Sequence, residues 1–186
     1  MRIITGTARG TKLKTLEGYD TRPTTEMCKE AVFSAIQFDI HDRYVLDLFG
    51  GSGQMALEAL SRGAERAVII DSSRAACDVI KENALKTKFM KQCRVVCIDW
   101  KEYLRSASGK EKFELVFLDP PYTEGLLDDV LHRLQYTEVL APNAIIIAES
   151  DQDGIPKEID GWSSKLYRYG KTYVTIYRLE QSGGDE

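Results

Sequence analysis

Asp119-Pro120-Pro121-Tyr122 is the segment of this 186-residue chain whose residue types most directly suggest chemistry. Two consecutive prolines fix φ and remove two backbone N–H donors, so the turn offers acceptors only. Such a turn can receive an exocyclic amino group, which donates its two N–H bonds to the Asp119 side chain and the Pro120 carbonyl. The nitrogen lone pair is then aimed for attack, and Tyr122 offers a ring on which an extruded base can stack. The segment predicts chemistry at the amino group of a base.

A glycine-rich loop, DLFGGSGQMA at residues 47–56, follows the first apolar run of the chain. Its spacing fits the G-x-G-x-x-G/A fingerprint at Gly51 and Gly53, which taken alone suits nicotinamide dinucleotides equally well. Asp47 distinguishes the two ligands, because a carboxylate repels the pyrophosphate of a dinucleotide and attracts the ammonium and sulfonium groups of S-adenosylmethionine. The loop therefore predicts an S-adenosylmethionine site, to which Phe49 also belongs.

Four short apolar runs of the chain each end in an aspartate. They are β-branched or aromatic and too short for helices, which is typical of strands covered on both faces. Because helix-like stretches separate them, the alternation predicts a parallel sheet with right-handed crossovers. The predicted strands are 44–47, 67–71, 95–99 and 115–119, and the predicted helices are 53–62, 73–88, 100–107 and 123–137.

The four terminal aspartates should lie along one edge of this sheet, where ligands bind beyond the carboxyl ends of parallel strands. Asp71 follows Gly53 at the distance where an acid accepts hydrogen bonds from ribose hydroxyls. Asp99 can contact the adenine amino group, and Trp100 offers an apolar surface beside the ring. For Asp71 or Asp99 taken alone, an ordinary helix cap is an equally good interpretation.

The end of the chain departs from the alternation. A fifth strand is predicted at 144–149, and strands 164–169 and 172–179 alternate around Gly170-Lys171 as a hairpin. This hairpin should close the sheet in the antiparallel sense. The resulting fold class is α/β, with a mostly parallel central sheet.

The start of the chain predicts a small hairpin, 2–5 with 11–14, and an amphipathic helix that begins near Thr24-Thr25. The residues expected on the inward face of this helix are Met27, Ala31, Val32, Ala35 and Ile36. We divide the chain into an N-terminal extension at 1–40, a catalytic domain at 41–180 and a tail at 181–186.

The net charge of −4 conceals an asymmetry. Residues 1–22 carry five cations against two acids, so the rest of the chain is acidic. A basic arm on an acidic body suggests a local contact with a polyanion, although an ordinary solvated surface explains the same charges. The candidate contact residues are Arg2, Arg9, Lys12 and Arg22.

Other features of the composition exclude whole classes of function. No apolar run approaches the roughly 20 residues of a membrane span, so we expect no membrane partner. Four cysteines without a C-x-x-C pair and only two histidines favour neither a disulfide framework nor a metal site. We expect a cytoplasmic protein without a metal, and a monomer.

In this order, the glycine loop, Asp71, Asp99 and the D-P-P-Y turn resemble the class I, Rossmann-like, S-adenosylmethionine-dependent methyltransferases that act on exocyclic amines. The flanking segments are similar to the bacterial 16S ribosomal RNA guanine-N2 methyltransferases of the RsmD type, over about residues 1–179. Two departures, Gly50 for alanine and Asp71 for glutamate, keep the chemistry. The segments that carry this resemblance are RIITGTARG at 2–10 with Lys12-Leu13, Thr21–Thr24, Glu30 with Phe33, Leu57–Ala64, and Tyr169–Thr172.

The resemblance implies methylation of the 2-amino group of one guanine in small-subunit ribosomal RNA, on an assembled or partly assembled ribosomal particle, with S-adenosylhomocysteine as the other product. It implies an amine site at Asp119, Pro120 and Tyr122, and RNA contacts from the basic arm. The cofactor site would comprise Asp47, Phe49, Gly51, Gly53, Asp71, Asp99 and Trp100.

Three other functions remain open from the sequence. The same motifs serve DNA adenine-N6 and cytosine-N4 methyltransferases, although a chain of 186 residues leaves little room for a DNA-recognition region. Protein-glutamine methyltransferases favour Asn at the position of Asp119. A non-catalytic RNA-binding assembly factor with this fold is the third alternative, and the intact D-P-P-Y turn speaks against it.

Overall fold

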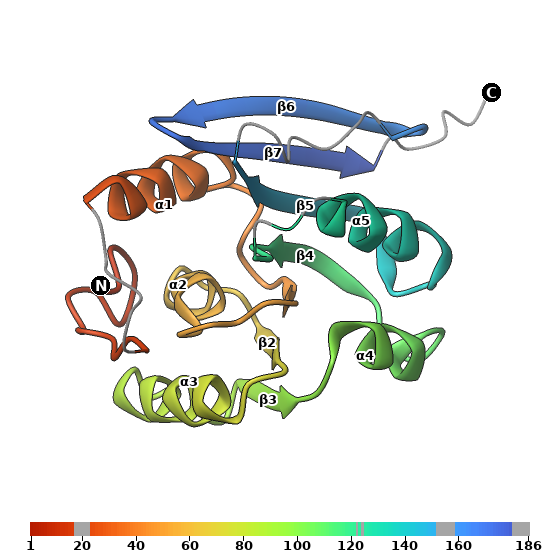
Figure 1. The fold of residues 1–186 in the computed structure, drawn as a ribbon. Coiled ribbons are helices and arrows are strands. Elements are labelled where there is room, and N and C mark those ends of the chain that lie inside the picture. The colour runs from red at the N-terminus through yellow and green to blue at the C-terminus, as the bar shows by residue number, and fades with distance from the viewer. Residues whose placement is uncertain (17–22, 122, 124, 152–158, 180–186) are drawn as a thin grey trace.

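Seven strands form one sheet in the order β3-β2-β1-β4-β5-β7-β6, with helices on both faces (Figure 1). The computed structural model describes residues 1–16, 23–121, 123, 125–151 and 159–179. The strands are β1 (Tyr44–Asp47), β2 (Arg66–Asp71), β3 (Cys93–Cys97), β4 (Phe113–Leu118), β5 (Leu140–Ser150), β6 (Trp162–Tyr169) and β7 (Thr172–Leu179). The helices are α1 (Pro23–Ala35), α2 (Gln54–Ser61), α3 (Arg74–Lys86), α4 (Trp100–Ala107) and α5 (Leu126–Tyr136).

The direction in which successive strands are added to the sheet reverses between β1 and β4. The chain runs outward from β1 through β2 to β3, then crosses to β4 on the other side of β1. Asp47 at the end of β1 pairs with Phe117 of β4, so the segments that follow these two strands leave the sheet side by side. A switch point of this kind is where ligands bind in open α/β sheets.

Two hydrophobic clusters cover the sheet, one on each face. The first holds α1, α2 and α3 against the strands, and Phe33 of α1 meets Phe117 of β4 with ring centroids 5.6 Å apart. The second holds α4 and α5 on the opposite face. Ile3 and Leu13, from the N-terminal extension, are buried in the first cluster, so the extension shares the core of the sheet.

The predicted α/β fold, with its parallel strands and antiparallel C-terminal hairpin, is confirmed. The bounds differ in detail: β3 ends at Cys97, β4 at Leu118, and β5 is longer than predicted. The N-terminal hairpin is present in reduced form, as a single antiparallel bridge between Arg2 and Lys12. The backbone N–H groups of Ile4 and Thr5 donate instead to the side chain of Glu58, which explains why the hairpin ladder does not extend beyond this bridge.

The inward face of α1 is predicted correctly at Val32 and Ile36, which are buried, and wrongly at Met27 and Ala35. Met27 is 70% exposed and Ala35 is also exposed, whereas Cys28, Lys29 and Phe33 are buried. The buried face also includes Lys29, a charged residue that periodicity assigns to solvent and that pairs with Glu58 inside the protein. Among the described residues, no helix is long and apolar enough to cross a bilayer.

Candidate functional site

The glycine loop turns sharply over the carboxyl ends of β1 and β2. The N–H of Gly50 donates to the carbonyl of Ile70 (2.7 Å), and Gly53, at the start of α2, has a φ of 76°. A Cβ at Gly50 would lie 2.5 Å from Cγ2 of Ile69, which explains why glycine stands where alanine was expected. At Gly51 the φ is 55°, and a Cβ would meet nothing within 4 Å, so this part of the loop faces open space.

Asp47 is only 3% exposed at the start of this loop. Its carboxylate accepts hydrogen bonds from the backbone N–H groups of Ala56 and Phe49. Burial is the main reason that its pKa rises to about 7, and repulsion from Asp71 adds to the effect. Because the carboxyl is close to half-ionised at neutral pH, a nearby cation would favour its charged form.

Asp71 closes the loop from the end of β2. One carboxylate oxygen accepts from the N–H of Gly51 (2.9 Å), and the other accepts from the N–H of Ser73 (2.8 Å). The half-buried carboxylate therefore lies directly beside the part of the loop that faces open space.

Asp99 and Trp100 follow β3 at the start of α4. Asp99 is exposed, and its carboxylate caps the helix by accepting from the N–H of Lys101 (2.8 Å). Trp100 is 8% exposed and belongs to the second hydrophobic cluster, with its ring centroid 6.2 Å from that of Phe49. The helix-cap interpretation of Asp99 thus holds structurally, and most of the Trp100 ring already contacts protein.

Asp119 follows β4 at the same sheet edge, where the residue is exposed to solvent. Its pKa lies well above the usual value, because the surrounding protein removes hydration from the carboxyl and because Glu149 and Asp47 repel its charge. Pro120 is buried behind it. Tyr122 lies outside the described residues.

A narrow cavity opens next to Asp119, between α1 and the sheet. Sequence analysis missed Glu149 and Cys28, which both line it. The available signal was that Glu149 ends the fifth predicted strand, 144–149, just as an aspartate ends each of the four apolar runs before it. The residues around the cavity are Cys28, Lys29, Val32, Gln54, Met55, Phe117, Leu118, Asp119, Ile147, Glu149 and Val174.

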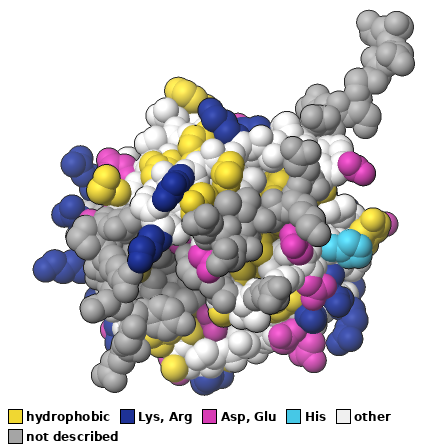
Figure 2. Space-filling model, turned by 45° about the horizontal axis from the view of Figure 1, so that its top comes forward, with side chains coloured by type: hydrophobic (Ala, Val, Ile, Leu, Met, Phe, Trp, Pro, Cys, Tyr) yellow, Lys and Arg dark blue, Asp and Glu magenta, His cyan; other side chains and the backbone are white. Residues whose placement is uncertain are grey.

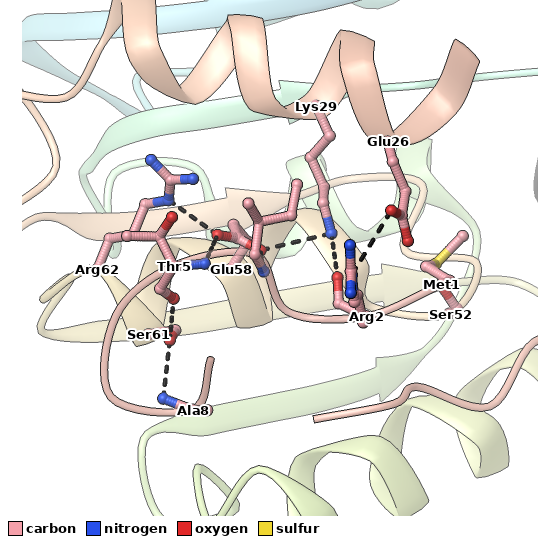
Figure 3. Close-up of polar contacts among 11 residues, drawn as sticks. Met1, Arg2, Thr5, Ala8, Glu26, Lys29, Ser52, Glu58, Ser61 and Arg62 are labelled. Carbon is pink, nitrogen blue, oxygen red and sulfur yellow. Dashed lines mark hydrogen bonds and ion pairs between the residues drawn. The ribbon is translucent and has the colours of Figure 1, made fainter. Parts of the chain in front are cut away.

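The N-terminal segment is held against α2 by a buried acid (Figure 3). Glu58 of α2 is fully buried and accepts from the N–H groups of Ile4 (2.8 Å) and Thr5 (3.0 Å). It also pairs with Lys29 (3.4 Å) and Arg62 (2.9 Å). Sequence analysis missed this network, which joins residues far apart in the chain.

Asn83 of α3 makes a second attachment. This fully buried amide accepts from the N–H of Lys14 (2.8 Å), and its Nδ2 donates to the carbonyls of Lys14 and Ser52, at 2.9 Å each. Because Ser52 lies within the glycine loop, one side chain contacts both the N-terminal segment and that loop.

The cations of the N-terminal segment face solvent. Arg2, Arg9 and Lys12 are exposed, and Figure 2 shows Lys and Arg side chains gathered along the side of the molecule where Figure 1 places this segment. Arg22 lies outside the described residues. In the part of the chain that the structure describes, no group of three or more His, Cys, Asp or Glu residues could hold a metal ion.

Comparison with known proteins finds similarity over nearly the whole chain. A family model described as "Conserved hypothetical protein 95" matches residues 1–178. The ribosomal RNA small subunit methyltransferase D of Escherichia coli strain K12 is 36% identical over 182 residues, which cover 97% of this chain and 89% of that one. The protein of the same name from Haemophilus influenzae is 32% identical over 183 residues, with 98% and 94% covered. The solved structure of yhhF from Escherichia coli matches with a TM-score of 0.86 at 34% identity, covering 98% and 99%.

Proposed function

This chain belongs to the methyltransferase family described as conserved hypothetical protein 95, the RsmD type, and from that premise we propose that it methylates small-subunit ribosomal RNA with S-adenosylmethionine as donor. We further propose that the acceptor is the 2-amino group of one guanine. The RNA would be recognised within an assembled or partly assembled ribosomal particle, by a monomeric cytoplasmic enzyme.

The observation that carries the proposal is the adjacency of the glycine loop and the Asp119 turn at the switch point of the sheet. The pairing of Asp47 with Phe117 brings the ends of β1 and β4 together. One segment suits a cationic donor and the other suits an amine, so a donor and an acceptor would meet where the two segments leave the sheet.

The residues at this edge fit S-adenosylmethionine better than a dinucleotide. Asp47 and Asp71 are carboxylates at the glycine loop, and each would repel a pyrophosphate. When bound, S-adenosylmethionine supplies an activated methyl group on a positively charged sulfur. The candidate binding residues are Asp47, Phe49, Gly51, Gly53, Asp71, Asp99 and Trp100, of which the last offers only a small free surface.

Asp119 and Pro120 would position the acceptor. The Asp119 carboxylate and the Pro120 carbonyl accept the two N–H bonds of the guanine 2-amino group, so that its lone pair points at the methyl group. During methyl transfer the carboxylate would stabilise the positive charge that develops on the amine, and the amine would lose its surplus proton after the transfer. Tyr122 would stack on the extruded base.

The exposed cations of residues 1–22 would hold the RNA backbone. Arg2, Arg9, Lys12 and Arg22 are proposed as phosphate contacts, which orient the substrate without reading its sequence. We propose residues 1–40 as the RNA-contacting extension of a catalytic domain at 41–180.

The test is mass mapping of ribosomal RNA from cells that lack the protein. One methyl group should be missing from one small-subunit guanine, and expression of the wild-type chain but not of Asp119→Ala should restore it. An intact methylation pattern would refute the proposal. Incorporation of labelled methyl groups into duplex DNA rather than small ribosomal subunits would favour the DNA alternative.

A further inference from the structure

Glu149 lies beside Asp119 at the carboxyl edge of the sheet. Leu118 of β4 pairs with Ala148 of β5, and each of these two residues is followed by an acid. Both acids line the same cavity, and repulsion from Glu149 is one reason that the pKa of Asp119 is raised. Two carboxyl groups on adjacent parallel strands therefore face one opening.

The remaining walls of the cavity are mostly apolar. Val32 of α1, Phe117 of β4 and Val174 of β7 are buried there. The enclosed part measures about 20 Å³, which holds about one water molecule, so a base could present only its edge at the mouth. The polar groups at the opening, rather than the interior of the cavity, would determine which edge fits.

Among the described residues that line the cavity, Lys29 and Cys28 are the other titratable groups, and neither is placed to accept a hydrogen bond from a base. Lys29 is turned toward the N-terminal segment, where its Nζ lies 2.7 Å from the carbonyl oxygen of Arg2 and 3.4 Å from Glu58. Cys28 keeps its proton, because burial and the charges of Glu149 and Asp119 raise the pKa of the thiol to about 12.

Guanine differs from the other bases in the edge that such a pair of acceptors would meet. Its N1–H and 2-amino groups are neighbouring donors, whereas adenine and cytosine carry an acceptor at the ring nitrogen beside their amino group. A carboxylate facing that ring nitrogen therefore accepts a hydrogen bond from guanine and repels the lone pair of the other two bases.

We propose that Glu149 selects guanine by accepting a hydrogen bond from its N1–H, while Asp119 accepts one from the 2-amino group. This inference rests on the proposed function and adds a residue that determines base specificity. In this proposal Asp119 and Pro120 position the amine, and Glu149 determines which base is accepted.

The test replaces the target guanine, once mapped, by 2-aminopurine in a reconstituted small subunit. This base keeps the 2-amino group but has an unprotonated N1. Wild-type protein should strongly prefer guanine. In Glu149→Gln the side-chain NH₂ can donate to N1, so the ratio of kcat/KM for guanine over 2-aminopurine should fall by about tenfold to a hundredfold, the range of one good base contact.

The matched control is Glu102→Gln, which removes the same charge from an exposed position on α4 and should leave the ratio unchanged. Equal loss of activity on both bases in Glu149→Gln would reduce Glu149 to a structural role and overturn the inference. Failure of the wild-type protein to methylate the guanine substrate would instead refute the proposed function.

Discussion

Lys29 and Glu58 form an ion pair inside the protein, with 3.4 Å between Nζ and Oε2 and side chains that are 2% and 0% exposed. Burial lowers the pKa of Lys29, and the charge of Glu58 opposes that shift. The pair joins α1 to α2, and the same glutamate binds the backbone of Ile4 and Thr5. The attachment of the N-terminal segment thus involves the buried charge of Lys29, a residue that sequence periodicity assigns to solvent.

Replacing Glu58 by alanine should destabilise the protein strongly. The substitution leaves Lys29 without its buried counter-ion and removes the acceptor for two backbone N–H groups. Loss of one partner of a buried pair costs about 3–5 kcal/mol. Urea unfolding followed by fluorescence of the two tryptophans measures the change.

Lys29→Met is the informative comparison for that experiment. Glu58 then keeps Arg62 as a partner at 2.9 Å, so this variant should lose less stability than Glu58→Ala. A loss below about 1 kcal/mol in Glu58→Ala, the range of an exposed pair, would contradict the buried network.

The stability of the ligand-free protein should fall between about pH 4 and pH 7 because of Asp47. The folded pKa of about 7 exceeds the ordinary aspartate value of 3.8, so the folded state binds more protons in this interval and stability decreases as the pH rises. Below the interval both states are protonated, and above it the penalty is constant at about 4 kcal/mol.

Asp47→Asn isolates this contribution. The substitution also changes the unfolding free energy by an amount that does not depend on pH. On top of that amount, the unfolding free energy of the variant minus that of the wild type should increase as the pH rises from 4 to 7. Above pH 7 this difference should stay constant. A difference that does not change with pH would show that the folded Asp47 is ionised throughout.

Asp119→Ala should separate turnover from donor binding. Because the proposed role of this side chain is to position the acceptor, and because it lies outside the glycine loop, methyl transfer should fall at least about a hundredfold while donor affinity stays within a few-fold. Single-turnover assays with labelled donor and calorimetry measure the two effects.

Asp78→Ala, at an exposed position on α3, is the control for that variant and should behave as wild type in both assays. Methylation by Asp119→Ala at near the wild-type rate would show that the amine binds elsewhere.

Arg9→Ala with Lys12→Ala should weaken RNA binding and reduce its salt dependence. Each phosphate contact contributes a slope of about 0.7–0.9 in the logarithmic salt plot, so loss of two contacts should lower the slope by about 1.5. Binding titrations from low to moderate salt measure this slope.

Lys110→Ala with Lys112→Ala removes the same charge from exposed positions just before β4, at the amino ends of the parallel strands. That variant should keep the wild-type slope. Equal slopes for both double variants would show that Arg9 and Lys12 make no contact with RNA phosphates.

Much of the fold could be predicted because buried parallel strands leave uninterrupted apolar runs in the sequence. The ends of these runs also placed Asp47, Asp71 and Asp119 at one edge, where the structure has them. The inward position of Lys29 on α1 could not be predicted, since periodicity assigns such a charged residue to solvent. Its burial depends on Glu58, 29 positions later in the chain.

The candidate site also has features that the sequence predicts and features that it does not. The loop and turn motifs are local, so their residues are visible in the sequence. Neither the cavity nor the approach of Glu149 to Asp119 is local, because both depend on the register of β4 against β5. The contacts of Asn83 join three separate segments and leave no pattern in any one of them.

The contacts of Asn83 restrict which substitutions this position can accept during evolution. Its single amide satisfies the backbone of both Lys14 and Ser52, so a substitution at position 83 disturbs two distant segments together. Lys14 and Ser52 contribute only backbone atoms to these contacts, which almost any residue type can supply. In related chains position 83 should therefore tolerate fewer substitutions than positions 14 and 52.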